Sequence, residues 1–122
     1  MANVITYPAL QLERDSVLLG GYFDPNGSSA PTSVYGRGIS SVAHTATGRW
    51  TVTLADTWKA LFPNAFLSLA TSADLNLICD EVGTSTFVVV ALAAAVETDI
   101  AAATNNRIFL QILCRNAEQV VL

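Results

Sequence analysis

The 122-residue sequence predicts a single all-β domain spanning residues 1–122. Apolar and polar residues alternate with a period of two in about eight short segments, and turn formers separate these segments every 8 to 12 residues or so. The chain has no internal repeat and no linker, and it is long enough to bury a core without disulfides or metals. We therefore expect an eight-stranded jelly-roll-like sandwich, with a closed barrel as the alternative.

Segment 39–56 predicts a β-hairpin from which the rest of the sheet can be built. Trp50, Val52 and Leu54 alternate with threonines, which gives the second strand one apolar face and one hydroxyl-bearing face. The link before this strand is short enough only for a hairpin turn, and its Gly48 is free to take a positive φ. Because an isolated hairpin is marginally stable, we expect other strands to cover its apolar face.

Three segments precede this hairpin. Residues 1–14 contain a proline in the middle, which favours an edge strand or an extended arm. Residues 16–23 read as a strand, in which the paired glycines at positions 20 and 21 indicate a bulge or a bend. Residues 24–33 gather turn formers without periodicity, and this composition predicts an exposed loop.

A change of period after the hairpin predicts one short helix near residues 56–62. Trp58, Leu61 and Phe62 stand at positions i, i+3 and i+4 behind an acidic residue that can cap the helix, and Pro63 follows as a stop. We expect this helix to lay its aromatic face across the open end of the sheet.

Four more strands are predicted in the rest of the chain, at residues 65–71, 75–82, 86–96 and 107–115. The short links between the first three favour a meander or part of a Greek key. The last two are apolar on both faces, as expected for strands that are covered on both sides. If a partner subunit covers one of those sides, the candidates for the subunit interface are Val89, Leu92, Phe109 and Leu113.

The composition also favours association. The chain is 52% hydrophobic but only 13% charged, about half of the charged fraction typical of soluble domains. Surface alanines are one explanation, and coverage of an apolar surface by partner subunits is the other.

Charge and hydropathy exclude two classes of partner. The net charge is −4 and the six basic residues are scattered, so the chain offers no positive patch for a nucleic acid. The longest apolar run, residues 87–96, is shorter than the roughly 20 residues that a membrane-spanning helix requires. The N-terminus lacks a basic segment followed by an apolar one, so we expect no secretory signal and no membrane partner.

No catalytic or metal-binding constellation is predicted. Cys79 and Cys114 fall on apolar alternations and are expected to be free and buried, and their spacing from the single histidine, His44, does not make a zinc site. We expect His44 to be solvated or at the rim of the hairpin turn. The adjacent Asp80 and Glu81 are expected to point to opposite faces of a strand.

Two further carboxylates, Glu97 and Asp99, share one side of an extended segment and are explained by a solvated loop. The sequence thus favours a protein that is not an enzyme and that has no cofactor.

Three segments, 35–42, 47–56 and 108–116, resemble small virion proteins of tailed bacteriophages. In those proteins a Gly-x-Gly motif precedes a strand and the pattern Thr-Gly-x-aromatic-Thr-Val-Thr-Leu before an acidic residue, and the last strand ends in an Arg-Asn pair. The members often carry a serine pair after Arg-Asn, where this chain has Ala117 and Glu118.

The resemblance implies a capsid decoration, cement or head-fibre protein with a jelly-roll-like fold. It further implies a homotrimer that binds the major capsid protein on the outer shell of a virion after synthesis in the host cytoplasm. A receptor-binding or ligand-binding β-module of a phage virion, with segment 24–33 at its working end, is the alternative.

Overall fold

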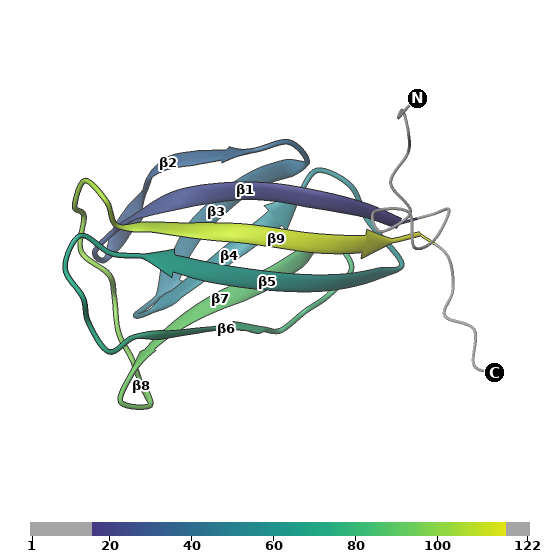
Figure 1. Cartoon of the computed structure of the whole chain (residues 1–122). Helices are drawn as coiled ribbons and strands as arrows, with labels where there is room; N and C mark the ends of the chain where they lie inside the picture. Colours follow the sequence, from purple (N-terminus) through teal and green to yellow (C-terminus); the bar gives the residue numbers. More distant parts are fainter. Residues whose placement is uncertain (1–15, 117–122) are drawn as a thin grey trace, which may run out of the picture.

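The computed structural model describes residues 16–116, which form nine antiparallel β-strands (Figure 1). The strands are β1 (Ser16–Asn26), β2 (Ser29–Gly36), β3 (Ile39–Ala46), β4 (Arg49–Leu54), β5 (Ala60–Ser68), β6 (Asn76–Asp80), β7 (Thr86–Ala93), β8 (Val96–Glu97) and β9 (Arg107–Arg115). The predicted arm at residues 1–14 and the pair Ala117 and Glu118 lie outside the described residues.

The strands divide into two sheets that lie one behind the other (Figure 1). Sheet A has the order β2-β1-β9-β5, and sheet B has the order β3-β4-β7-β6, with β8 paired to β7. The all-β prediction is confirmed, and the sheets do not join into a closed barrel. The predicted strand 107–115 coincides with β9.

Alternation along the strands places the core between the two sheets. The 39–56 hairpin is confirmed as β3 and β4, and Trp50, Val52 and Leu54 face inward from β4. The Trp50 ring packs against the ring of Phe23 from sheet A, with the two centroids 5.8 Å apart. Buried core positions come from both sheets and from the segment after β8, namely Phe23, Val42, Trp50, Val52, Leu54, Leu61, Phe87, Val89, Ala91, Ile100, Ile108, Leu110, Ile112 and Cys114.

The two cysteines are free, as predicted, and they differ in exposure. Cys114 is fully buried and Cys79 is half-buried. Burial raises the pKa of the Cys114 thiol to about 11 and also raises the pKa of Cys79. Both thiols are therefore held in the less nucleophilic protonated form at neutral pH.

The predicted helix at 56–62 is wrong, because β5 already begins at Ala60. Leu61 is buried whereas its neighbour Phe62 is exposed, an alternation that belongs to a strand. A helix of one or two turns gains little by itself, whereas pairing with β9 supplies a full ladder of backbone hydrogen bonds. Pro63 is accommodated because β5 is an edge strand of sheet A.

The predicted loop at 24–33 is also wrong, because these residues form the β1–β2 hairpin. Its two-residue turn contains Gly27 with a φ of 60°, the positive value that tight hairpin turns use. The register of this hairpin shifts between Asp24 and Asn26. That irregularity falls at Pro25, which has no N–H to donate to the ladder.

The predicted bulge at Gly20 and Gly21 is absent from the β1–β9 ladder, which is regular through both residues. Gly21 instead pairs with Gly36, and the side chain of Ile39 enters the space that this pair leaves. A Cβ on Gly21 would lie 2.7 Å from the Ile39 side chain. These glycines therefore allow β3 to pack closely against sheet A.

The segments 65–71 and 75–82, predicted as neighbours, separate into different sheets. β5 lies in sheet A, whereas β6 pairs with β7 in sheet B. The apolar run of β7 is buried on both faces within one subunit, since even the outward-facing Val88 and Val90 are buried.

Candidate binding face

The outer face of sheet A carries the largest collection of exposed apolar side chains in the described part of the chain. Antiparallel pairing places residues from β2, β1, β9 and β5 side by side in rows across this face. Five exposed large apolar residues belong to it, namely Leu18, Tyr35, Phe62, Phe66 and Phe109.

The aromatic row crosses all four strands and comprises Tyr35, Tyr22, Phe109 and Phe66. The rings of Tyr22 and Tyr35 stack with their centroids 5.4 Å apart and their planes at 27°. Phe109 follows at 6.1 Å from the Tyr22 centroid, and its Cα pairs with Phe66 on β5. Tyr35 is 67% exposed and Phe66 is 51% exposed, so the row presents aromatic surface to solvent.

An ion pair stands next to the aromatic row. The Arg107 guanidinium lies 3.9 Å from the centre of the Tyr22 ring and donates to both carboxylate oxygens of Asp24, at 2.7 and 3.1 Å. Hydrogen bonding to Asp24 raises the pKa of Arg107, and the nearby charge of Asp24 adds to this effect. The contact with the Tyr22 ring and the hydrogen bonds to Asp24 together fix the plane of the guanidinium, and the Asp24 carboxylate offsets its positive charge.

A cavity of about 250 Å³ adjoins the Phe109 end of the aromatic row. Its walls supply two hydroxyls, one amide, one guanidinium and one phenyl ring, from Ser68, Thr104, Asn105, Arg107 and Phe109. The lining is mainly polar, so a ligand in this cavity would be held by hydrogen bonds more than by apolar contact.

Hydrogen bonds of Asn106 hold the loop that supplies one wall of this cavity. Asn106 donates from its side-chain amide to the carbonyl of Ala101 and accepts from the backbone N–H of Ala70, both at 2.8 Å. Its own backbone N–H donates to Ala103 at 3.0 Å. One side chain thereby joins the loop before β9 to the loop after β5.

A second apolar row, Leu18, Leu113 and Phe62, lies where β1 begins and β9 ends. It is separated from the aromatic row by Gly20, Gln111 and Asn64, a row without large apolar groups. Leu113 and Phe109 are four positions apart on β9, so the two rows are about 13 Å apart.

The four candidate interface residues separate into different environments. Phe109 belongs to the aromatic row and Leu113 to the second apolar row. Leu92 is half-buried and faces outward on sheet B, opposite Asn76. Val89 is fully buried in the core of its own subunit and offers no surface to a partner.

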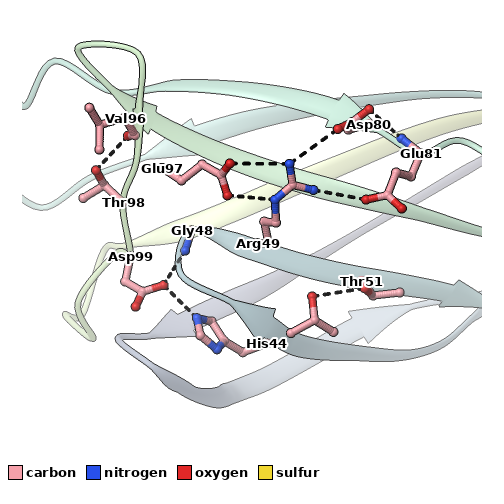
Figure 2. Close-up of polar contacts among 11 residues, drawn as sticks. His44, Gly48, Arg49, Thr51, Asp80, Glu81, Val96, Glu97, Thr98 and Asp99 are labelled. Carbon is pink, nitrogen blue, oxygen red and sulfur yellow. Dashed lines mark hydrogen bonds and ion pairs between the residues drawn. The ribbon is translucent and has the colours of Figure 1, made fainter.

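A charged cluster lies on the opposite sheet, centred on Arg49 of β4 (Figure 2). The guanidinium donates to Glu97 at 2.7 Å and to Glu81 at 3.1 Å, and it lies 3.6 Å from Asp80. The prediction that Asp80 and Glu81 point to opposite faces is wrong. Glu81 lies beyond the end of β6 with a φ of 46°, and this turn brings both carboxylates to one guanidinium.

Arg49 is paired with Val90 in the β4–β7 ladder, so its side chain shares the outer face of sheet B with Val88 and Val90. The cluster thus lies on the outer face of the apolar strand β7, one side of which was predicted to be covered by a partner or by a second sheet. Hydrogen bonding to Glu97 raises the pKa of Arg49, which keeps the guanidinium charged.

His44 and Asp99 form the second polar contact of this region (Figure 2). The Nε2 of His44 lies 2.7 Å from Asp99 Oδ1, and the backbone N–H of Gly48 donates to the same oxygen at 2.6 Å. The His44 side chain is only 10% exposed, which contradicts the expectation of a solvated or rim position. Burial raises the pKa of Asp99, but the hydrogen bonds from Gly48 and His44 outweigh it and leave the pKa below its ordinary value.

These contacts hold the segment that follows β8 against the hairpin turn. Thr98 donates its backbone N–H to Ala91 at 2.9 Å, and the Ile100 carbonyl accepts from Gly27 at 2.8 Å. Asp99 therefore serves to fix this segment, and within the described residues no cluster of three or more metal-ligating side chains occurs. Glu97 and Asp99, expected in a solvated loop, are both engaged in pairs.

Sequence reasoning missed the aromatic row because it depends on which strands are neighbours. Successive side chains of a strand point to opposite faces, so Tyr22 points away from the face of the buried Phe23, and Phe66 away from the face of Leu67. This signal marks outward-facing aromatic residues, but it does not align them across three strand pairs.

Comparison of the chain with protein-family models, with curated proteins and with solved structures found no match. Among the described residues, no helix is long and apolar enough to cross a membrane.

Proposed function

We propose that the protein is a non-enzymatic structural component of a phage virion, a capsid decoration or cement protein that binds the outer capsid shell as a homotrimer. Its partners are its own copies and the major capsid protein, and its location is the capsid surface. The proposal includes the jelly-roll-like connectivity of the resembling virion proteins. The pairing of β1 with β9, which brings the two ends of the described chain together, supports it.

The observation that carries the proposal is the apolar outer face of sheet A. Exposed apolar side chains that gather on one face mark an interaction site, and this face carries two apolar rows with Gly20, Gln111 and Asn64 between them. The low charged fraction agrees with a chain whose surface is partly covered by partners.

The second apolar row is the part of that face that we assign to contact between subunits. Leu18, Leu113 and Phe62 lie together on three neighbouring strands, and Phe62 is 49% exposed. None of the three is paired with a charged residue in the ladders, and the charge nearest to the row along β9 is Arg115, two positions after Leu113.

Light scattering of the purified protein, with and without purified capsid shells that lack it, tests the proposal. We expect three times the chain mass in solution and saturable binding to the shells. Val96→Asp, at an exposed apolar position of sheet B, should retain both properties. A monomer that does not bind shells would refute the proposal.

A second candidate is a ligand-binding β-module of the virion. The cavity beside the aromatic row favours it, because subunit contact alone requires no preformed site lined by hydroxyl, amide and guanidinium groups. In this candidate function the ligand binds at the aromatic row, and segment 24–33 takes part through Asp24, which pairs with Arg107 beside the row.

A further inference from the structure

We propose that the aromatic row and the adjoining cavity form a binding site for a neutral oligosaccharide. The occupant is a chain of pyranose rings, one of which enters the cavity while the next lie along the row. The proposal requires only the folded subunit and does not depend on attachment to a capsid.

The aromatic row fits the apolar faces of sugar rings. Aromatic rings carry a negative face, on which the weakly positive C–H bonds of a pyranose can lie. Tyr22 stacks on Tyr35 at 27° and its ring also carries the Arg107 guanidinium at 3.9 Å, so Tyr22 supports its neighbours and the exposed Tyr35 offers the ring surface at this end of the row. Phe109 and Phe66 continue this surface across β9 and β5.

The cavity fits the hydroxyl edge of a sugar. Ser68 and Thr104 supply hydroxyls that donate and accept, and Asn105 supplies an amide that does both. A volume of about 250 Å³ is below the roughly 300–1,000 Å³ of most ligand pockets, so the cavity can take at most a single ring unit. The contacts of Asn106 hold this wall in place before a ligand arrives.

The charges at the site select a neutral ligand. Arg107 donates to both oxygens of Asp24, so the ion pair contributes no net charge next to the row. A nucleic acid or an acidic glycan would need cationic groups that are not already neutralised. The remaining donors of Arg107 and the accepting capacity of Asp24 can hydrogen-bond to hydroxyl groups without any change in charge.

Native gel electrophoresis in the presence of three soluble neutral polysaccharides, namely dextran, yeast mannan and hydroxyethyl cellulose, tests this site. At least one of them should retard the protein, and heparin should not. Phe66→Ala and Tyr35→Ala should each weaken the retardation roughly five- to tenfold, the loss expected for one stacking contact.

Ile78→Ala is the control, because Ile78 is 47% exposed against 51% for Phe66 and lies on β6 of sheet B, away from both apolar rows. It should bind polysaccharide as the unchanged protein does. Circular dichroism and light scattering of every variant separate loss of binding from loss of folding or association. Retardation by none of the three polysaccharides would overturn the proposal, and so would an equal loss in Ile78→Ala.

The two proposals fail in different ways. A monomeric protein that binds a polysaccharide would refute trimeric decoration and leave the sugar site standing. A trimer that binds shells but no polysaccharide would refute the sugar site and leave trimeric decoration standing.

Discussion

At the scale of single residues, Gly48 shows how one position can meet two independent demands. Its φ of 69° lies in the left-handed region that side chains disfavour. In addition, a Cβ at this position would lie 2.6 Å from the backbone nitrogen of Thr98. The turn between β3 and β4 and the segment after β8 can meet only because this residue has no side chain.

Gly48→Ala should therefore cost more stability than the same change at Gly27. Gly27 has a similar φ of 60°, but no atom lies within 4 Å of a Cβ built there. Gly27→Ala should lose about 1–3 kcal/mol from backbone strain alone. Gly48→Ala should lose clearly more, as measured by urea denaturation. Equal losses would show that Thr98 does not approach the turn closely.

At the scale of elements, local sequence patterns predicted the strands whose alternation agrees with the strand pairing in the fold. The 39–54 hairpin and β9 were predictable because their alternation agrees with the ladders that form. The 56–62 helix failed because its local signal competed with the β5–β9 pairing. Of the three apolar residues at helical spacing, Trp58 precedes β5, whereas Leu61 and Phe62 lie in it, one buried and the other exposed.

The charged cluster could not be predicted because it depends on long-range proximity. Arg49 is 32 positions from Glu81 and 48 positions from Glu97 in the chain. Strand parity even predicted the wrong geometry for Asp80 and Glu81, since the positive φ of Glu81 ends the alternation. Of the candidate interface residues, Phe109 and Leu113 share the outward parity of β9, whereas Val89 is in the core.

The segment after β8 should loosen in acid because Asp99 holds it. The pKa of Asp99 is lowered in the folded protein, so its contribution to stability is present above the unfolded value near pH 4 and disappears as the pH falls through the folded value. Asp99→Asn should therefore be less stable than the unchanged protein at pH 6. The two should become alike once the pH has fallen below the folded pKa of Asp99.

Urea midpoints measured from pH 6 to pH 2.5 would show this convergence. The remaining carboxylates titrate in both proteins, so the difference between the two curves isolates Asp99. A constant difference across this range would show that the ionised carboxylate of Asp99 does not hold the segment.

At the scale of the whole molecule, neighbouring positions of β9 should respond to charge in opposite ways. Ile112 is fully buried between the sheets, whereas Leu113 lies in the second apolar row on the outer face. Ile112→Asp should unfold the subunit, because it places a carboxylate in the core without a partner. Leu113→Asp should leave a folded subunit that no longer associates.

Circular dichroism and light scattering distinguish these outcomes. An unfolded Leu113→Asp would contradict the assignment of the outer face, and a folded Leu113→Asp that stays trimeric would move the subunit contact elsewhere.

The place of β9 in the middle of sheet A has a consequence for synthesis on the ribosome. The four long strands of sheet B lie within residues 39–93 and can pair before β9 has emerged. β1 can pair with β2 early, but the β1–β2 hairpin and β5 join into one sheet only when residues 107–115 are available, because β1 and β5 each pair with β9 and not with the other. Domains that depend on such distant pairings fold late. The face with the most apolar surface is therefore the last to be assembled, which shortens the time during which growing chains can associate through it.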